Sequence, residues 1–308
     1  MRTESERCSV RSERLREPLA ATASTVPTWV LLEQPGPWGR FALTDSRLPE
    51  GVGRRLRTLS HDLGVRIVLI RRYGRVAPEE GSQAFLVGTG PGRPWMERLD
   101  LSEPVDLLDL ELSPMAVGLP PGLGSAETEP VFVVCTHGRR DPCCAERGRP
   151  VAQALDGAFG SRAWESSHVG GDRFAANLVA FPHGAYFGRV DPSNAVAVAR
   201  AYADGRLTLD HYRGRSCFPF AVQAAEIEVR KRLGLEEIDS LGEARWRTVG
   251  PGVLDVSIDR AAGATVVLRV RTVEADPARV LTCHGEEEVR PPAYVVEGFE
   301  TLRTRPRP

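Results

Sequence analysis

The amino-acid sequence predicts an α/β fold made of two successive α/β regions and a smaller β-rich C-terminal region. Strand-like apolar runs alternate with helical patterns in the first two regions, a Pro/Gly-rich segment separates them, and apolar strand patterns return near the C-terminus. The expected parts are a flexible charged arm at 1–26, an N-terminal α/β region at 27–117, a linker at 118–130, a second α/β domain at 131–243 and a β-rich region at 244–308.

The first α/β region has the pattern of a β-α-β-β unit. Trp29–Glu33 and Val65–Arg71 are apolar runs of strand length, and Gly51–Gly64 between them has its apolar residues at helical spacing. Ala84–Val87 predicts a further strand.

The second region repeats this order, although no sequence repeat is visible. Val131–Val134 predicts a buried strand that ends at Cys135, Cys144 opens a helix, and Ala163–Ser167 predicts the next strand. The later elements expected here are a hairpin of Ala176–Phe181 and Ala185–Val190, and helices at Asn194–Tyr202 and Phe220–Leu233.

The C-terminal region reads as a small sheet. Val253–Ile258 and Thr265–Val270 flank Gly263, and Tyr294–Val296 follows. The last six residues, RTRPRP, are expected to be disordered.

Composition excludes several classes of protein. The 308 residues carry 40 basic and 41 acidic side chains, a net charge of −1, so the basic excess of a general nucleic-acid binder is missing. The longest apolar runs are far shorter than the roughly 20 residues of a membrane-spanning helix. The first 20 residues contain no apolar stretch typical of a secretory signal, so a cytoplasmic protein is expected.

A cluster of cysteine and histidine residues carries the chemistry. Cys135 ends a strand, Cys144 begins the following helix, and His168 ends the next strand. Strand ends and helix starts meet at one edge of an α/β layer, so these three side chains should converge as metal ligands. The helix N-terminus, together with Arg139 and Arg140, should favour thiolates there.

The loop after His168 contains two glycines. Gly170 and Gly171 have no side chains, so their backbone N–H groups are expected to approach a bound cofactor.

The clustering of three cysteines within ten residues also has a chemical meaning. In a reducing compartment, it indicates a metal site or redox chemistry rather than a disulfide.

The motifs CTHGRRDPCC and HVGGDRFAANLVAFPHGAYFGRV resemble the sucrase/ferredoxin-like family. The resemblance implies a thioredoxin-like domain with a [2Fe–2S] cluster, held by two cysteines spaced like Cys135 and Cys144 and by two histidines of an HxGGH motif. His168 matches the first histidine, whereas Asp172 stands at the second. Asp172 is the favoured fourth ligand, and Cys143 is the alternative.

The implied function is that of an iron–sulfur electron carrier rather than an enzyme. Its electrons would come from a separate reductase and pass to an acceptor, and the sequence identifies neither partner. One alternative is a thiol–disulfide or peroxide-reducing enzyme with Cys144 as nucleophile and Cys135 or Cys143 as resolving thiol. A structural zinc site is another.

The remaining histidines and cysteines considered are not expected to belong to this site. His137 is expected to be solvated and His183 to lie on the surface, and Cys217 is expected in the core. Cys8 and Cys283 are isolated in sequence, and a second redox thiol at either position is the alternative to a structural role.

Overall fold

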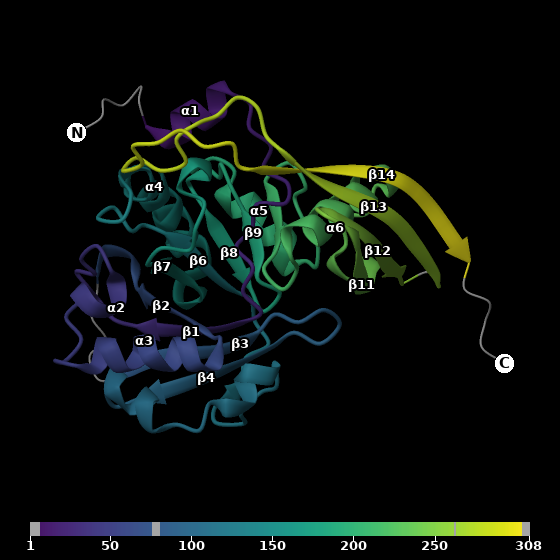
Figure 1. Ribbon diagram of the computed structural model, residues 1–308. Coiled ribbons are helices and arrows are strands. Elements are labelled where there is room, and N and C mark those ends of the chain that lie inside the picture. Colours follow the sequence, from purple (N-terminus) through teal and green to yellow (C-terminus); the bar gives the residue numbers. More distant parts are fainter. Residues whose placement is uncertain (1–6, 76–80, 262, 304–308) are drawn as a thin grey trace.

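One curled sheet runs through both α/β regions (Figure 1). The computed structural model describes residues 7–75, 81–261 and 263–303. Within them the sheet has ten strands in the order β10-β9-β8-β6-β7-β2-β1-β3-β4-β5. Their bounds are β1 Thr28–Glu33, β2 Arg66–Arg71, β3 Ser82–Gly88, β4 Trp95–Leu101, β5 Ser125–Ala126, β6 Val131–Cys135, β7 Ala163–Ser166, β8 Leu178–Phe181, β9 Ala185–Phe187 and β10 Tyr212–Arg215.

The sheet consists of two units with the same strand order. In the first unit β1 and β2 are parallel and β3 is antiparallel to β1, while in the second β6 and β7 are parallel and β8 is antiparallel to β6. The units join where β2 pairs antiparallel with β7. The two β-α-β-β units expected from the sequence are therefore present, and they share one sheet. A buried ion pair between Arg71 and Glu165, with Nε and Oε2 2.6 Å apart, spans the junction.

Helices cover the outer faces of the two units. The helices are α1 Cys8–Arg14, α2 Ala42–Asp45, α3 Val52–Leu63, α4 Pro142–Phe159, α5 Ala195–Ala203 and α6 Phe220–Leu233. Alternate residues of a strand point to opposite faces, so Val30 and Leu32 of β1 pack under α3, whereas Trp29 and Leu31 enter a core shared by both units. Cys135 of β6 also lies in that shared core.

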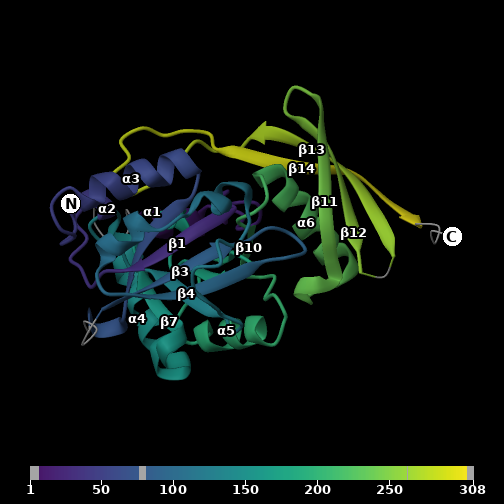
Figure 2. The ribbon, with the colours of Figure 1, turned by 90° about the horizontal axis from the view of Figure 1, so that it is seen from below.

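A second, antiparallel sheet forms the C-terminal region (Figure 2). It contains β11 Leu241–Gly250, β12 Val253–Arg260, β13 Ala264–Glu274 and β14 Pro292–Arg303, in that order. The expected strands are present but longer, and β11 was not anticipated because exposed polar residues alternate irregularly along it. Its apolar face packs against α6.

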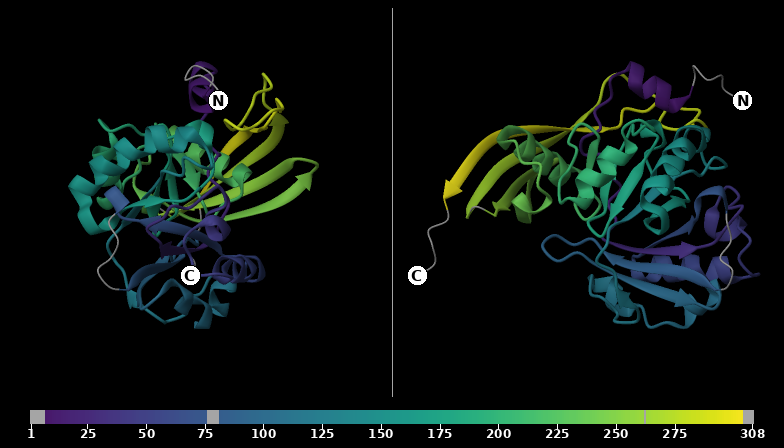
Figure 3. Two further views of the ribbon diagram at one scale, coloured as in Figure 1. Left: turned by 90° about the vertical axis from the view of Figure 1, so that its left-hand side faces the viewer. Right: turned by 180° about the vertical axis from the view of Figure 1, so that it is seen from behind.

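A segment near each end of the chain lies against the second unit. Between β13 and β14, residues 275–291 run back beside α1 and the start of α4, as Figures 1 and 3 show. The expected flexible arm is instead packed over its described part: Cys8 and Ala23 are buried, and Val26 N–H donates to the Ser216 carbonyl. Residues 1–6, and 304–308 of the expected disordered tail, lie outside the described residues.

Two further findings concern the linker and membranes. The linker at 118–130 contributes β5, which pairs with β4 and forms the edge of the sheet, so the linker also belongs to the sheet. None of the helices in the described ranges has the length and apolar character needed to cross a bilayer.

His183 was expected on the surface, but it is partly buried in the turn between β8 and β9. Its Nδ1 lies 2.6 Å from the Tyr202 hydroxyl. Burial, with Arg215 and Arg230 nearby, lowers the pKa of His183 to about 3.

This depressed pKa predicts acid sensitivity. An unfolded histidine titrates near about 6.5, so the unfolded chain binds an extra proton between that pH and about 3. The contribution of neutral His183 is thus complete above about pH 6.5 and lost on acidification, by a few kcal/mol, since one pKa unit corresponds to about 1.4 kcal/mol. Urea unfolding of the parent and His183→Asn chains at pH 7 and 5 should show a smaller stability difference at pH 5. If the stability difference between the two chains is the same at pH 7 and pH 5, the titration of His183 is not its cause.

Candidate metal centre

Three elements of the second unit bring the predicted ligands together. Cys135 ends β6, Cys144 lies in the first turn of α4, and His168 follows β7. The helix begins at Pro142 rather than at Cys144, because the Asp141 side chain caps it by accepting the Cys143 N–H at 2.9 Å.

The ligand atoms of Cys135, Cys144 and His168 all lie within 4.8 Å of one another. Both thiols are buried, while the imidazole remains 23% exposed. This confirms that the three side chains converge at one sheet edge. Their role as ligands stays a prediction.

Asp172 contacts two members of this group. Its Oδ1 accepts from the Cys144 thiol at 3.2 Å and lies 3.0 Å from Nδ1 of His168. The Asp172 oxygen and this ring nitrogen are close but not aligned for a hydrogen bond. Nδ1 is therefore buried without a hydrogen-bond partner among the described residues. Two sulfurs, one imidazole and one carboxylate form a donor set that suits iron or zinc.

Proton positions in this group are strongly biased. The hydrogen bond with Cys144 lowers the pKa of Cys135 against the opposing effect of burial, and His168 lowers it further. The same contact, with burial, raises the pKa of Cys144. Burial lowers the pKa of His168, but Asp172 and Cys135 outweigh it and raise that pKa to about 9. Burial would raise the pKa of Asp172, yet His168 holds it below its ordinary value.

The pKa shifts favour protons on Cys144 and His168 rather than on Cys135 and Asp172. The expectation that the helix N-terminus favours thiolates here stays a prediction: contact with Cys135 raises the pKa of Cys144, while the same contact lowers that of Cys135. A bound cation would displace these protons, so metal binding should release them.

His137 positions the loop that carries His168. It was expected to be solvated, but it is buried, with Nε2 2.8 Å from the Gly39 carbonyl oxygen. Its Nδ1 accepts the backbone N–H of His168 at 3.2 Å. Burial lowers the pKa of His137, which keeps the ring neutral and able to accept that bond. A histidine in a polar loop gives no sequence signal for this role.

Backbone conformation and close packing within the chain explain why glycine stands at positions 170 and 171. Both have positive φ angles, 100° and 81°. A Cβ at Gly170 would lie 2.4 Å from Ser24 Oγ, and one at Gly171 would lie 2.3 Å from Arg213 Nη2. Contact of their N–H groups with a cofactor stays a prediction.

Cys143 belongs to a different group. It lies with Cys8, Cys283 and Asp141, whose ligand atoms are also within 4.8 Å of one another. The structure thus separates Cys143 from its neighbour Cys144. It also joins the two terminal cysteines to a site that the sequence analysis missed, since no spacing connects residues so far apart.

An open pocket of about 320 Å³ lies beside His168. Among the described residues that line it are no carboxylates. Its charged or titratable lining residues are Arg40, Arg57, Arg66, Arg140, His137 and His168. The surface next to the candidate centre is therefore basic.

Fold and site together define a mixed α/β protein with buried cysteine, histidine and aspartate side chains that could hold a metal ion. The chain belongs to the sucrase/ferredoxin-like family, which matches residues 19–214, more than half of its length. This family suggests a redox or electron-transfer role. Comparisons with curated proteins and with solved structures give no match.

Proposed function

We propose that this protein is an electron carrier whose [2Fe–2S] cluster is held by Cys135, Cys144, His168 and Asp172. The observation that carries the proposal is the convergence of these four side chains, within a chain of the sucrase/ferredoxin-like family. When bound, a [2Fe–2S] cluster accepts and releases a single electron.

The side chains are suited to that cofactor. Cys135 already favours the thiolate form, and Cys144 would join it after losing its proton. Nδ1 of His168, which pairs with Asp172 without an aligned hydrogen bond, would bind the metal, and Asp172 would supply the fourth donor from the same loop. Burial of the two sulfurs excludes water from them.

The strand order of the second unit supports a thioredoxin-like domain. A parallel β6–β7 pair with its crossover helix α4, followed by the β8–β9 hairpin beside β6, gives the order β7-β6-β8-β9. This is the arrangement of a thioredoxin-like core. The cysteine ligands then occupy the end of its first strand and the start of its first helix.

Electron exchange is proposed to take place at the basic pocket. His168 is the partly exposed member of the group, and it lines this pocket. A reductase or an acceptor with an acidic docking surface would bring its own redox centre closest to the cluster there.

The absorption spectrum of anaerobically purified protein tests the proposal. The expected protein is red-brown, with thiolate-to-iron charge-transfer bands and iron and acid-labile sulfide in equal amounts. Dithionite should bleach it and produce the paramagnetic signal of a one-electron-reduced pair of irons. A colourless protein with zinc in this site would establish the structural-zinc alternative instead.

The thiol-enzyme alternative is less compatible with the geometry. Its proposed nucleophile Cys144 is fully buried, and its pKa is raised rather than lowered. Of its two proposed resolving thiols, Cys143 faces the other cysteine group, whereas Cys135 lies beside Cys144 and is also buried. A peroxide or disulfide substrate would have no path to either sulfur without movement of the surrounding loop.

A further inference from the structure

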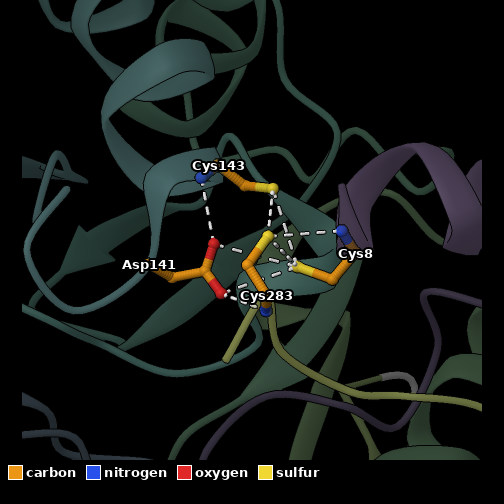
Figure 4. Close-up of side chains that lie close together, drawn as sticks. All are labelled: Cys8, Asp141, Cys143 and Cys283. Atoms are coloured by element: carbon orange, nitrogen blue, oxygen red, sulfur yellow. Dashed lines mark hydrogen bonds between the residues drawn. The ribbon is translucent and has the colours of Figure 1, made fainter. Parts of the chain in front are cut away.

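A second group of thiols lies at the start of α4, apart from the candidate cluster site (Figure 4). The sulfur of Cys143 lies 3.6 Å from that of Cys8 and 3.4 Å from that of Cys283, and the sulfurs of Cys8 and Cys283 are 3.6 Å apart. The Asp141 carboxylate completes the group, with Oδ2 3.7 Å from Cys8 Sγ.

Three distant segments build this group. Cys8 begins α1, Asp141 and Cys143 lie at the start of α4, and Cys283 comes from the segment between β13 and β14. Cys8 and Cys283 lie outside residues 19–214, the part of the chain that matches the family. The site therefore depends on the N-terminal and C-terminal additions to that part.

We propose that Cys8, Cys143, Cys283 and Asp141 bind a single tetrahedral metal ion, zinc, which joins both ends of the chain to α4. Zinc lies about 2.3 Å from each thiolate ligand, so two sulfurs in a tetrahedral site are about 3.8 Å apart. The observed triangle of 3.4 to 3.6 Å is within a few tenths of an ångström of that size.

The same distances argue against a disulfide. A disulfide holds its sulfurs about 2.05 Å apart and would leave one thiol of the three over. Three sulfurs in mutual contact match the ligand shell of one tetrahedral ion.

Hydrogen bonds to the sulfurs already suit thiolates. The Cys8 N–H donates to Cys283 Sγ at 3.4 Å, and the Ser9 hydroxyl donates to Cys143 Sγ at 3.3 Å. Asp141 is fixed in turn, because its two oxygens accept the N–H groups of Cys143 and Cys283. Such outer contacts are typical of metal sites, where they orient the ligands.

The buried acidic groups of this site would also be stabilised by a bound cation. Asp141 is fully buried, and burial raises its pKa. Three thiols in mutual contact lie beside this carboxyl group, and all three are buried. Of the cations nearby, Arg7 is already paired with Glu146. A divalent ion would stabilise the carboxylate and the thiolates together.

Metal analysis of the purified full-length chain is the first test. Protein produced in zinc-supplemented medium should contain one zinc per chain, measured beside iron and sulfide. Cys8→Ser and Cys283→Ser should each lose that zinc, whereas the matched control Cys217→Ser should keep it, since Cys217 belongs to neither group. The visible spectrum of all these variants reports the other site separately.

Cobalt(II) serves as the spectroscopic probe. Added to chelator-treated protein carrying Cys135→Ser and Cys144→Ser, it should give one equivalent of tetrahedral thiolate–cobalt absorption. Asp141→Asn should weaken binding, and because Asn also caps helices well, α4 should persist. If a variant fails to fold, hydrogen exchange of the parent chain before and after removal of the metal by a chelator still tests the proposal. Residues 8–14 and 275–291 should exchange faster, and β1–β4 should not.

These measurements separate this proposal from the electron-carrier proposal. A colourless protein whose zinc is lost on Cys8→Ser or Cys283→Ser, but not on Cys135→Ser, supports the zinc site and leaves the [2Fe–2S] assignment wrong. A red-brown parent chain without zinc, and with no change in exchange on chelation, overturns the zinc site. A disulfide between Cys143 and Cys283, found by mass spectrometry without reduction, also overturns it.

Discussion

Cys135→Ser is expected to abolish the visible absorption and to reduce bound iron from two per chain to nearly none. Cys135 is one of the two proposed thiolate ligands, and a serine hydroxyl does not replace a thiolate on iron. Asp172→Ala should bleach or destabilise the cluster, because its carboxylate contacts both Cys144 and His168. Iron and sulfide content of anaerobically purified variants measures both effects.

Cys143→Ser is the matched control for this series. Its sulfur contacts Cys8 and Cys283, so the visible spectrum should stay nearly unchanged while bound zinc is lost. Adjacent helical residues point about 100° apart, which explains how neighbouring cysteines serve separate sites. The opposite pattern, in which Cys143→Ser bleaches the protein and Asp172→Ala does not, would make Cys143 the fourth ligand.

The elements of the two α/β units could be predicted from sequence because their apolar patterns are strong. α6 agrees with its predicted bounds, and β6 and α4 place Cys135 and Cys144 as expected. The pairing of β2 with β7 could not be predicted, since nothing in either strand specifies which edges join. The two α/β regions expected to be separate consequently form one sheet.

The candidate centre was predictable from local spacing, and the second thiol group was not. Cys135, Cys144 and His168 lie on consecutive elements whose ends must meet at one sheet edge. Cys8 and Cys283 are 275 positions apart, and their proximity depends on the return of residues 275–291 across the fold. The doubled cysteine at 143–144 was the one local sign that two groups converge there.

The reduction potential of the proposed cluster should depend on pH. A histidine ligand binds iron through one nitrogen, and its other nitrogen can bind a proton. Reduction adds negative charge and favours the protonated ring, so electron and proton uptake are coupled through His168, whose ring is 23% exposed. Between the ring pKa values of the oxidised and reduced forms, the potential should fall by about 59 mV per pH unit. Voltammetry from about pH 6 to 10 measures the slope, and a flat profile would exclude a titrating histidine ligand.

Asp172→His is expected to raise this potential. The core of two ferric ions and two sulfides carries +2; two thiolates and a neutral imidazole bring it to zero, and the Asp172 carboxylate brings it to −1. A neutral second histidine removes that charge and restores the HxGGH pattern that the family resemblance implies. Less negative ligand sets are easier to reduce, as in histidine-ligated Rieske centres. The same voltammetry on both forms gives the shift directly, with iron content confirming that the cluster is retained. A lower potential in the Asp172→His form would show that Asp172 does not ligate the cluster as a carboxylate.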